Sequence, residues 1–277
     1  MRRLFLALVL VAAPTGFAAA QEPLRVGVDG TFAPHAFPRL EGGVQGFNID
    51  LVNEIGRRLG RPVTIDAVAF SGLIPALNAG RYDFLGAPTS PTPERLANLL
   101  FTEGYLYSDY QFAIRRGSQP ITSLDELRGK AIAVNKGSNY DAWAQANAER
   151  YGFTVQTFDS QPDAVQAVFT GRAYANLAGN TVIRYAATRI RQLQPDYVIP
   201  GTRIEWAFPL RKDNVALRNQ IEGALECMKQ DGTVARISEK WFGTAPSPDS
   251  LERTVSPGYG LPDRPGHDPA PHELRCP

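Results

Sequence analysis

The stretch Gly86–Arg95, GAPTSPTPER, directly follows the apolar pair Phe84-Leu85, a pattern typical of the end of a buried strand. It brings hydroxyls, prolines and one arginine together within a short segment. A helix N-terminus with free N–H groups, hydroxyls before it and a guanidinium in its first turns can bind a carboxylate. The alternative is a Pro-rich turn whose Arg95 makes a surface ion pair. Taken alone, the stretch favours the turn.

On the N-terminal side of this stretch, short apolar runs alternate with helical periodicity. Strands are expected at 24–29, 63–68 and 82–85, and helices at about 51–59, after the lead-in 46–50, and at 71–80. This order predicts an α/β sheet with parallel crossovers. Ligands gather outside the carboxyl ends of such strands. We therefore expect the loops at Asp29–Phe32, Phe70 and Pro88–Arg95 to converge on one edge.

On the C-terminal side the pattern restarts. Strands are expected at 111–115, 131–135, 154–158 and 174–177, with helices at about 140–150, 165–169 and 180–190. The chain is extended again near 206–210, and two helices follow over 215–229 and up to Gly243. The sequence therefore predicts a second α/β unit of similar size. The segment after Thr244 is rich in Pro, Gly and Asp and should be irregular.

The composition limits the classes of function. With 277 residues, the chain is long enough for two modest domains or one large one. Lys and Arg number 29 against 28 Asp and Glu, and no basic block stands out, which argues against nucleic acid as a partner. The histidines, His35, His267 and His272, show no metal-ligand spacing, so we expect no metal site. No dinucleotide, phosphate-loop or nucleophile-elbow motif is present, so we expect no cofactor.

The N-terminus has the pattern of a secretory signal peptide. Two arginines precede an apolar run over 4–13, and small residues occupy 18–20. The run falls short of the ~20 residues that a membrane span requires. We expect residues 1–20 to be removed by cleavage after Ala20. In an exported chain, Cys227 and Cys276 are expected to form a disulfide that ties the tail back, with two free thiols as the alternative.

Several motifs occur in the order found in one family. They include RVGVDGTFAP (25–34), GFNIDL (46–51), FSGLIPALNAGRYD (70–83), TSPTPER (89–95) and DGTVARISEKWFG (231–243). Over about 24–243 the chain resembles the exported solute-binding proteins of family 3, which serve ABC importers of polar amino acids. The resemblance implies a type II periplasmic-binding-protein fold of two α/β lobes with a hinge of two crossover strands. The lobes would comprise residues 24–113 with 206–243, and residues 114–205, followed by a tail at 244–277.

The resemblance also implies a ligand site in the cleft. Arg95 matches the family arginine that pairs with the ligand carboxylate, and Ser90 and Pro88 match a donor and a backbone carbonyl beside it. Phe32 and Phe70 match aromatic positions that sandwich the ligand side chain, with core packing as the alternative. Three further positions are implied. Asp29 would contact polar or cationic side chains, and Ser138 and Asn139 would close onto the carboxylate from the second lobe.

One position departs from the family. Where the family usually places an Asp that pairs with the ligand ammonium, this chain has Gly179 followed by Asn180. An ammonium buried without a counter-charge is costly. Either Asn180, Asp29 or Glu205 substitutes for that Asp, or the ligand lacks a free α-amine.

The resemblance therefore implies a periplasmic, monomeric binding protein without enzyme activity. It would capture an amino acid or related small carboxylate and deliver it to the permease subunits of an ABC importer. One alternative is an exported cyclohexadienyl (arogenate/prephenate) dehydratase on the same scaffold, which requires a general acid in the cleft. The other is a ligand sensor that acts through a membrane partner.

Overall fold

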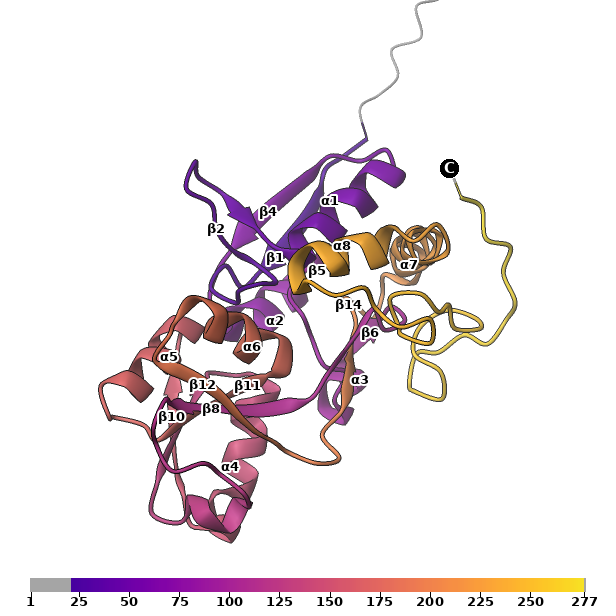
Figure 1. Ribbon diagram of the computed structural model, residues 1–277. Coiled ribbons are helices and arrows are strands. Elements are labelled where there is room, and N and C mark those ends of the chain that lie inside the picture. Colours follow the sequence, from indigo (N-terminus) through magenta and orange to yellow (C-terminus); the bar gives the residue numbers. More distant parts are fainter. Residues whose placement is uncertain (1–20, 277) are drawn as a thin grey trace, which may run out of the picture.

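A computed structural model describes residues 21–276, which fold into two α/β lobes (Figure 1). The first lobe contains a parallel sheet in the order β4 (Val63–Ala67), β1 (Leu24–Val28) and β5 (Phe84–Leu85). Helices α1 (Phe47–Arg58) and α2 (Phe70–Asn78) are the crossovers between these strands. Leu51, Val52 and Ile55 on α1 are buried, as the apolar spacing of that segment predicts.

The chain returns to the first lobe after it has built the second. Helices α7 (Val215–Gln230) and α8 (Thr233–Phe242) pack against α1. Strand β14 (Pro209–Arg211) pairs with β6 (Leu99–Phe101), which follows the short helix α3 (Pro93–Asn98). Residues after Trp206 therefore pack with the first lobe. A short hairpin of β2 (Phe37–Pro38) and β3 (Val44–Gln45) lies between β1 and α1 in the chain.

The second lobe contains a mixed sheet in the order β10, β9, β11, β8 and β12. Its strands are β8 (Tyr110–Arg115), β9 (Ala131–Asn135), β10 (Thr154–Phe158), β11 (Ala175–Gly179) and β12 (Leu193–Val198). Helices α4 (Asn139–Tyr151), α5 (Gln161–Phe169) and α6 (Asn180–Arg189) connect them. After Ser123 the chain forms a 3-10 turn, Leu124–Leu127.

Two antiparallel crossover strands join the lobes. Strand β7 (Leu106–Ser108) leads out of the first lobe, and β13 (Ile204–Trp206) leads back, paired with it. The predicted boundary between residues 113 and 114 needs a correction, because it falls inside β8. All of β8 pairs in the second sheet, so the change of lobe lies between β7 and β8. Sequence periodicity missed this because β7 and β8 form one almost continuous extended run.

The tail follows an irregular path along the first lobe, beside α7 and β6 (Figure 1). Within the described residues it contains neither a helix nor a named strand, as its composition predicts. The expected disulfide between Cys227 on α7 and Cys276 in the tail is present. It closes a loop over a sequence separation of 49 residues, which in the chain-entropy model stabilises the fold by about 4 kcal/mol.

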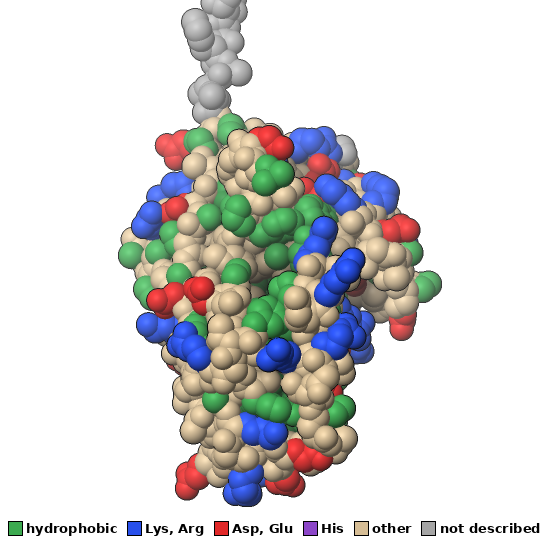
Figure 2. All heavy atoms as spheres, turned by 60° about the vertical axis from the view of Figure 1, so that its left-hand side comes forward, with side chains coloured by type: hydrophobic (Ala, Val, Ile, Leu, Met, Phe, Trp, Pro, Cys, Tyr) green, Lys and Arg blue, Asp and Glu red, His purple; other side chains and the backbone are tan. Residues whose placement is uncertain are grey.

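The surface view in Figure 2 shows hydrophobic side chains gathered near the middle of one face, with Lys and Arg side chains along one border. No helix within residues 21–276 is both long and apolar enough to cross a membrane. The predicted signal peptide, residues 1–20, lies outside the described residues.

Candidate ligand cleft

The two lobes meet in a closed arrangement. Four hydrogen bonds cross from the first lobe to the second, and they join Asp29 to Asn135 (2.9 Å), Arg95 to Gly137 (3.2 Å), His35 to Thr181 (2.9 Å) and Thr31 to Gln161 (3.4 Å). The closed cleft around Asp29, Phe70 and Trp206 has a volume of about 10 Å³, which is room for about one water molecule. A ligand larger than water therefore requires the lobes to open before it can enter this part of the cleft.

Six of the nine predicted site residues line this closed cleft together. They are Asp29, Phe32, Phe70, Pro88, Ser138 and Asn139. The first four come from loops and a helix start at the carboxyl ends of β1, β4 and β5, and the last two come from the start of α4. The expected convergence of three loops on one sheet edge is thus present, because parallel strands end at the same side.

Arg95 lies at the mouth of this cleft, in an adjoining hollow that Ser138 and Asn139 also line. Its guanidinium donates to the carbonyls of Ser90 (3.1 Å) and Gly137 (3.2 Å) and lies 5.4 Å from the centre of the Phe70 ring. Burial lowers the pKa of Arg95. Within residues 21–276, no Asp or Glu oxygen forms an ion pair with it. The guanidinium therefore has neutral acceptors in place of an anion.

The loop around Arg95 also explains its fixed position. Thr92 accepts a hydrogen bond from the Arg95 N–H as the N-cap of α3, and Pro93 occupies the first turn. Ser90 is buried, and its hydroxyl has no hydrogen-bond partner among the described residues. A hydroxyl and a guanidinium that share a neighbourhood, both without an anion, match the donor set of a carboxylate site.

Asp29 is the acid of the cleft floor, and only 1% of it is exposed. One carboxylate oxygen accepts from the N–H (3.0 Å) and hydroxyl (2.8 Å) of Thr31, and the other accepts from Asn135 (2.9 Å). Burial raises the pKa of Asp29, and the three donors partly oppose that rise. Its partners are all neutral, so a cation that entered the cleft would find an unpaired carboxylate.

Gly179 ends β11 beside two neutral hydroxyls. A Cβ atom at this position would lie 2.6 Å from the hydroxyl oxygens of Ser108 and Tyr140, and 3.1 Å from the Trp206 ring. The space that an acidic side chain would need is therefore filled. Both hydroxyls are buried and lack a hydrogen-bond partner among the described residues.

Neither Asn180 nor Glu205 replaces the missing acid in the cleft. The Asn180 amide points to Asp109 (3.4 Å), and Asn180 is absent from the cleft lining. The side chain of Glu205 lies against Gly104 on the side of the C-terminal tail. Of the three candidates considered from the sequence, Asp29 alone lines the cleft.

Sequence reasoning missed three cleft residues, which are Asn135, Tyr140 and Trp206. Asn135 and Tyr140 flank the Ser138-Asn139 helix start, so their positions at the end of β9 and in the first turn of α4 could have identified them from the sequence. Trp206 could not have been identified in this way, because it reaches the cleft only through the pairing of β13 with β7.

Ser138 and Asn139 also form hydrogen bonds within the second lobe. The Ser138 hydroxyl caps α4 by accepting from the Asp141 N–H (3.1 Å) and donates to the Asn135 carbonyl (2.6 Å). The Asn139 amide donates to the Tyr110 hydroxyl (2.7 Å). The Ser138 hydroxyl is thus already engaged by its own segment, although both residues line the cleft.

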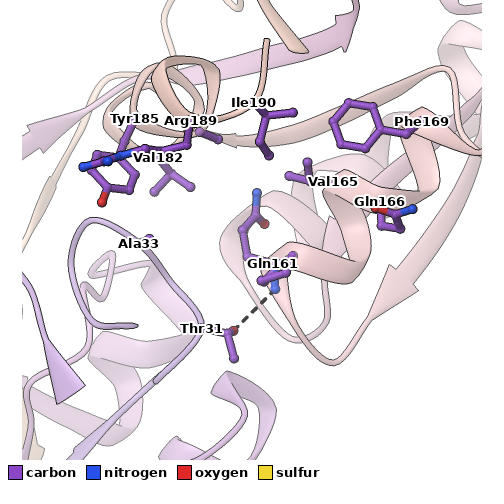
Figure 3. Close-up of a pocket in the computed structure, with 12 residues that line it drawn as sticks. Thr31, Ala33, Gln161, Val165, Gln166, Phe169, Val182, Tyr185, Arg189 and Ile190 are labelled. Carbon is purple, nitrogen blue, oxygen red and sulfur yellow. Dashed lines mark hydrogen bonds between the residues drawn. The ribbon is translucent and has the colours of Figure 1, made fainter. Parts of the chain in front are cut away.

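A larger hollow of about 280 Å³ lies away from these groups, between α5 and α6 (Figure 3). Val165, Val182 and Ile190 line it, and Thr31 and Ala33 of the first lobe close one side. None of the predicted site residues lines it. The described residues also contain no group of three His, Cys, Asp or Glu side chains placed to hold a metal ion.

Comparison with known proteins places this geometry among characterised relatives. A family model of bacterial extracellular solute-binding proteins, family 3, matches residues 24–244. The L-cystine-binding protein TcyJ of Escherichia coli K12 is 29% identical over 224 residues, which cover 79% of this chain and 82% of TcyJ.

Two solved structures extend the comparison. An ancestral arginine-binding protein bound to arginine is 32% identical, with a TM-score of 0.77, and the match covers 81% of this chain and all of that one. The ancestral amino acid-binding protein AncCDT-1, described as a precursor of cyclohexadienyl dehydratase, is 28% identical with a TM-score of 0.72. That match covers 79% of this chain and 95% of AncCDT-1.

Two α/β lobes that close over a polar cleft define the class of two-lobed solute-binding proteins, and the fold is of type II, as expected. Within that class, the chain belongs to the bacterial extracellular solute-binding proteins, family 3.

Proposed function

We propose that this protein captures an amino acid or a related small carboxylate between its lobes and delivers it to the permease subunits of an ABC importer. The observation that carries the proposal is Arg95, a guanidinium at the cleft mouth whose hydrogen-bond partners among the described residues are carbonyls. The relatives named above bind cystine or arginine, which supports a ligand of this kind.

In this proposal Arg95 forms paired hydrogen bonds with the ligand carboxylate, in place of those to Ser90 and Gly137. The Ser90 hydroxyl and the N–H groups at the start of α4 complete the carboxylate site. Phe32 and Phe70 pack against the ligand body, and Pro88 offers its carbonyl. Ligand contacts then replace the direct bonds between the lobes, so closure depends on ligand through a hinge motion at β7 and β13.

A thermal-shift screen over amino acids, their N-substituted derivatives and simple carboxylates tests this function. A ligand that binds only the folded state raises the melting temperature. We expect Arg95→Ala to abolish that shift, because truncating one partner of a buried charge pair costs about 2–5 kcal/mol of binding. Arg57→Ala removes an exposed arginine of α1 that lines neither the cleft nor the hollow at its mouth; it is the matched control and should respond as the parent does. An Arg95→Ala variant that responds fully would refute the carboxylate site.

The alternative of a dehydratase keeps one point in its favour, the resemblance to AncCDT-1. A dehydratase needs an acid that protonates the leaving hydroxyl, and the cleft offers Asp29 alone for that role. We propose that the chain acts by binding. Incubation with prephenate should produce no phenylpyruvate, and turnover would establish the enzyme instead.

We further propose that the protein works as a monomer in the periplasm after cleavage behind Ala20. Family membership supports export. N-terminal sequencing of protein from the native host checks the cleavage site, and light scattering checks the oligomeric state.

A further inference from the structure

Asp29 is the only acidic residue among those that line the closed cleft, and the guanidinium of Arg95 lies at its entrance. Glu94 borders the outer hollow but is exposed to solvent. A zwitterion with one negative and one positive group would match this pair of charges. A ligand with two cations would leave one of them without a counter-charge in a buried site.

The acid and the guanidinium belong to different ends of the cleft. They do not form an ion pair with each other, so their charged atoms lie more than 4.0 Å apart. Asp29 bonds to the side chain of Asn135, whereas Arg95 bonds to the carbonyl of Gly137. The Phe70 ring lines the cleft with Asp29 and also stacks near the Arg95 guanidinium, at 5.4 Å. The same apolar ring thus borders the space around both charges.

The buried groups near the carboxylate end include neutral hydroxyls, whereas Glu94, which also acts on the pKa of Arg95, is exposed to solvent. Tyr110 and Tyr140 are near enough to Arg95 for their hydroxyls to influence its pKa. Tyr140 also fills the space beside Gly179, together with Ser108. An ammonium attached next to a carboxylate held by Arg95 would therefore meet hydroxyls there and no carboxylate.

We infer that the ligand carries a carboxylate at one end and its single cation at the other, as ω-amino and ω-guanidino carboxylates do, with no ammonium beside the carboxylate. The inference rests on the proposed function, in which the cleft binds a small carboxylate through Arg95. Tyr140, Ser108 and Gly179 would then be the residues that reject α-amino acids, and Asp29 the residue that selects the distal cation.

Titration calorimetry on the mature chain with matched ligand pairs tests this. L-arginine and 5-guanidinopentanoate differ only in the α-ammonium, as do L-lysine and 6-aminohexanoate. We expect the member without the α-ammonium to bind roughly 30-fold or more tightly in each pair, the lower range for an unpaired buried charge. Equal or tighter binding of the α-amino acid, or tighter binding of norvaline than of 5-guanidinopentanoate, overturns the inference and leaves the proposed function standing. If no carboxylate binds at all, the proposed function fails.

Two variants sharpen the result. Gly179→Asp combined with Tyr140→Phe and Ser108→Ala supplies a carboxylate and removes the hydroxyls that a Cβ would meet. Relative to the double variant Tyr140→Phe/Ser108→Ala, it should bind L-arginine more tightly, and no gain would count against the inference. Should the triple variant fail to fold, Asp29→Asn provides the test. It should bring the affinity for 5-guanidinopentanoate down to that for pentanoate, and a retained preference would contradict the role of Asp29.

Discussion

Two regions of this protein contain buried charged side chains whose hydrogen-bond and ion-pair partners differ in kind. In the cleft, Asp29 and Arg95 have only neutral hydrogen-bond partners, and each has one of them across the boundary between the lobes. In the second region, the charged face of α7 carries Arg218, Glu222, Glu226 and Lys229, and all four are buried. We call this set the α7 cluster.

Each member of the α7 cluster has partners within the chain. Lys229 pairs with Glu103 (2.8 Å) and donates to the carbonyls of Gly104 (2.7 Å) and Thr254 (3.0 Å). The tail supplies most of the other partners. The Gly260 N–H donates to Glu222 (2.6 Å), the Gly266 carbonyl accepts from Arg218 (3.0 Å), and His272 bonds to Glu226 (2.7 Å).

The comparison distinguishes buried charges that stabilise the fold from buried charges that can bind a ligand. When a buried side chain forms an ion pair within the chain, the pair stabilises the fold, and removing one partner leaves the other charge uncompensated. A charge held by neutral groups across a movable boundary contributes little to the fold and can exchange those groups for a ligand. We therefore expect charge substitutions to affect mainly stability in the α7 cluster and mainly binding in the cleft.

Lys229→Met should have the largest effect on stability. It leaves the Glu103 carboxylate buried without its cation, which costs about 3–5 kcal/mol. Urea denaturation should show a lower midpoint with an unchanged slope. Adding Glu103→Gln removes the stranded charge while keeping an acceptor for the Ser256 N–H, so the double variant should recover much of the loss. A fully stable Lys229→Met protein would contradict the role assigned to the α7 cluster.

The pH dependence of stability should be the next largest effect. Burial raises the pKa of Glu222 to about 8, so the folded state holds a proton that the unfolded chain releases near its ordinary pKa. The stability that this provides is complete at low pH and is lost as the pH rises through about 8, by at most about 1.4 kcal/mol per pH unit. Glu222→Gln should flatten the fall in unfolding free energy between about pH 5 and 9. An unchanged slope would rule out this assignment.

Asp29→Asn should have the smallest effect on stability, within about 1 kcal/mol of the parent or slightly favourable. Burial raises the pKa of Asp29, so its charge is already unfavourable in the folded state without ligand. The Asn135 side-chain oxygen has no partner among the described residues and can accept from the new amide. Urea denaturation without ligand checks this. A loss as large as that of Lys229→Met would erase the contrast between the two regions.

Much of the fold was predictable because it depends on local patterns. The apolar spacing on α1 and α7 and the strand and helix order around Gly86–Arg95 carried the α/β assignment. The family motifs carried the two-lobed form. The charged face of α7 shows the limit of this reasoning. Residues 218, 222, 226 and 229 fall on one side of the helix and would be assigned to solvent, yet the tail covers them. Periodicity tells which residues share a face but cannot tell what covers that face.

The candidate site divides in the same way. The sequence by itself determined that loops after three parallel strands bring Asp29, Phe70 and Arg95 to one edge, because strand polarity fixes where those loops lie. It also determined that position 179 carries no acid. Only the tertiary structure decided that Tyr140, Ser108 and Trp206 fill that space, and that Asn180 turns away to Asp109. These contacts join segments far apart in the chain, and they depend on how β13 pairs with β7 and how the lobes close, which local sequence patterns do not encode.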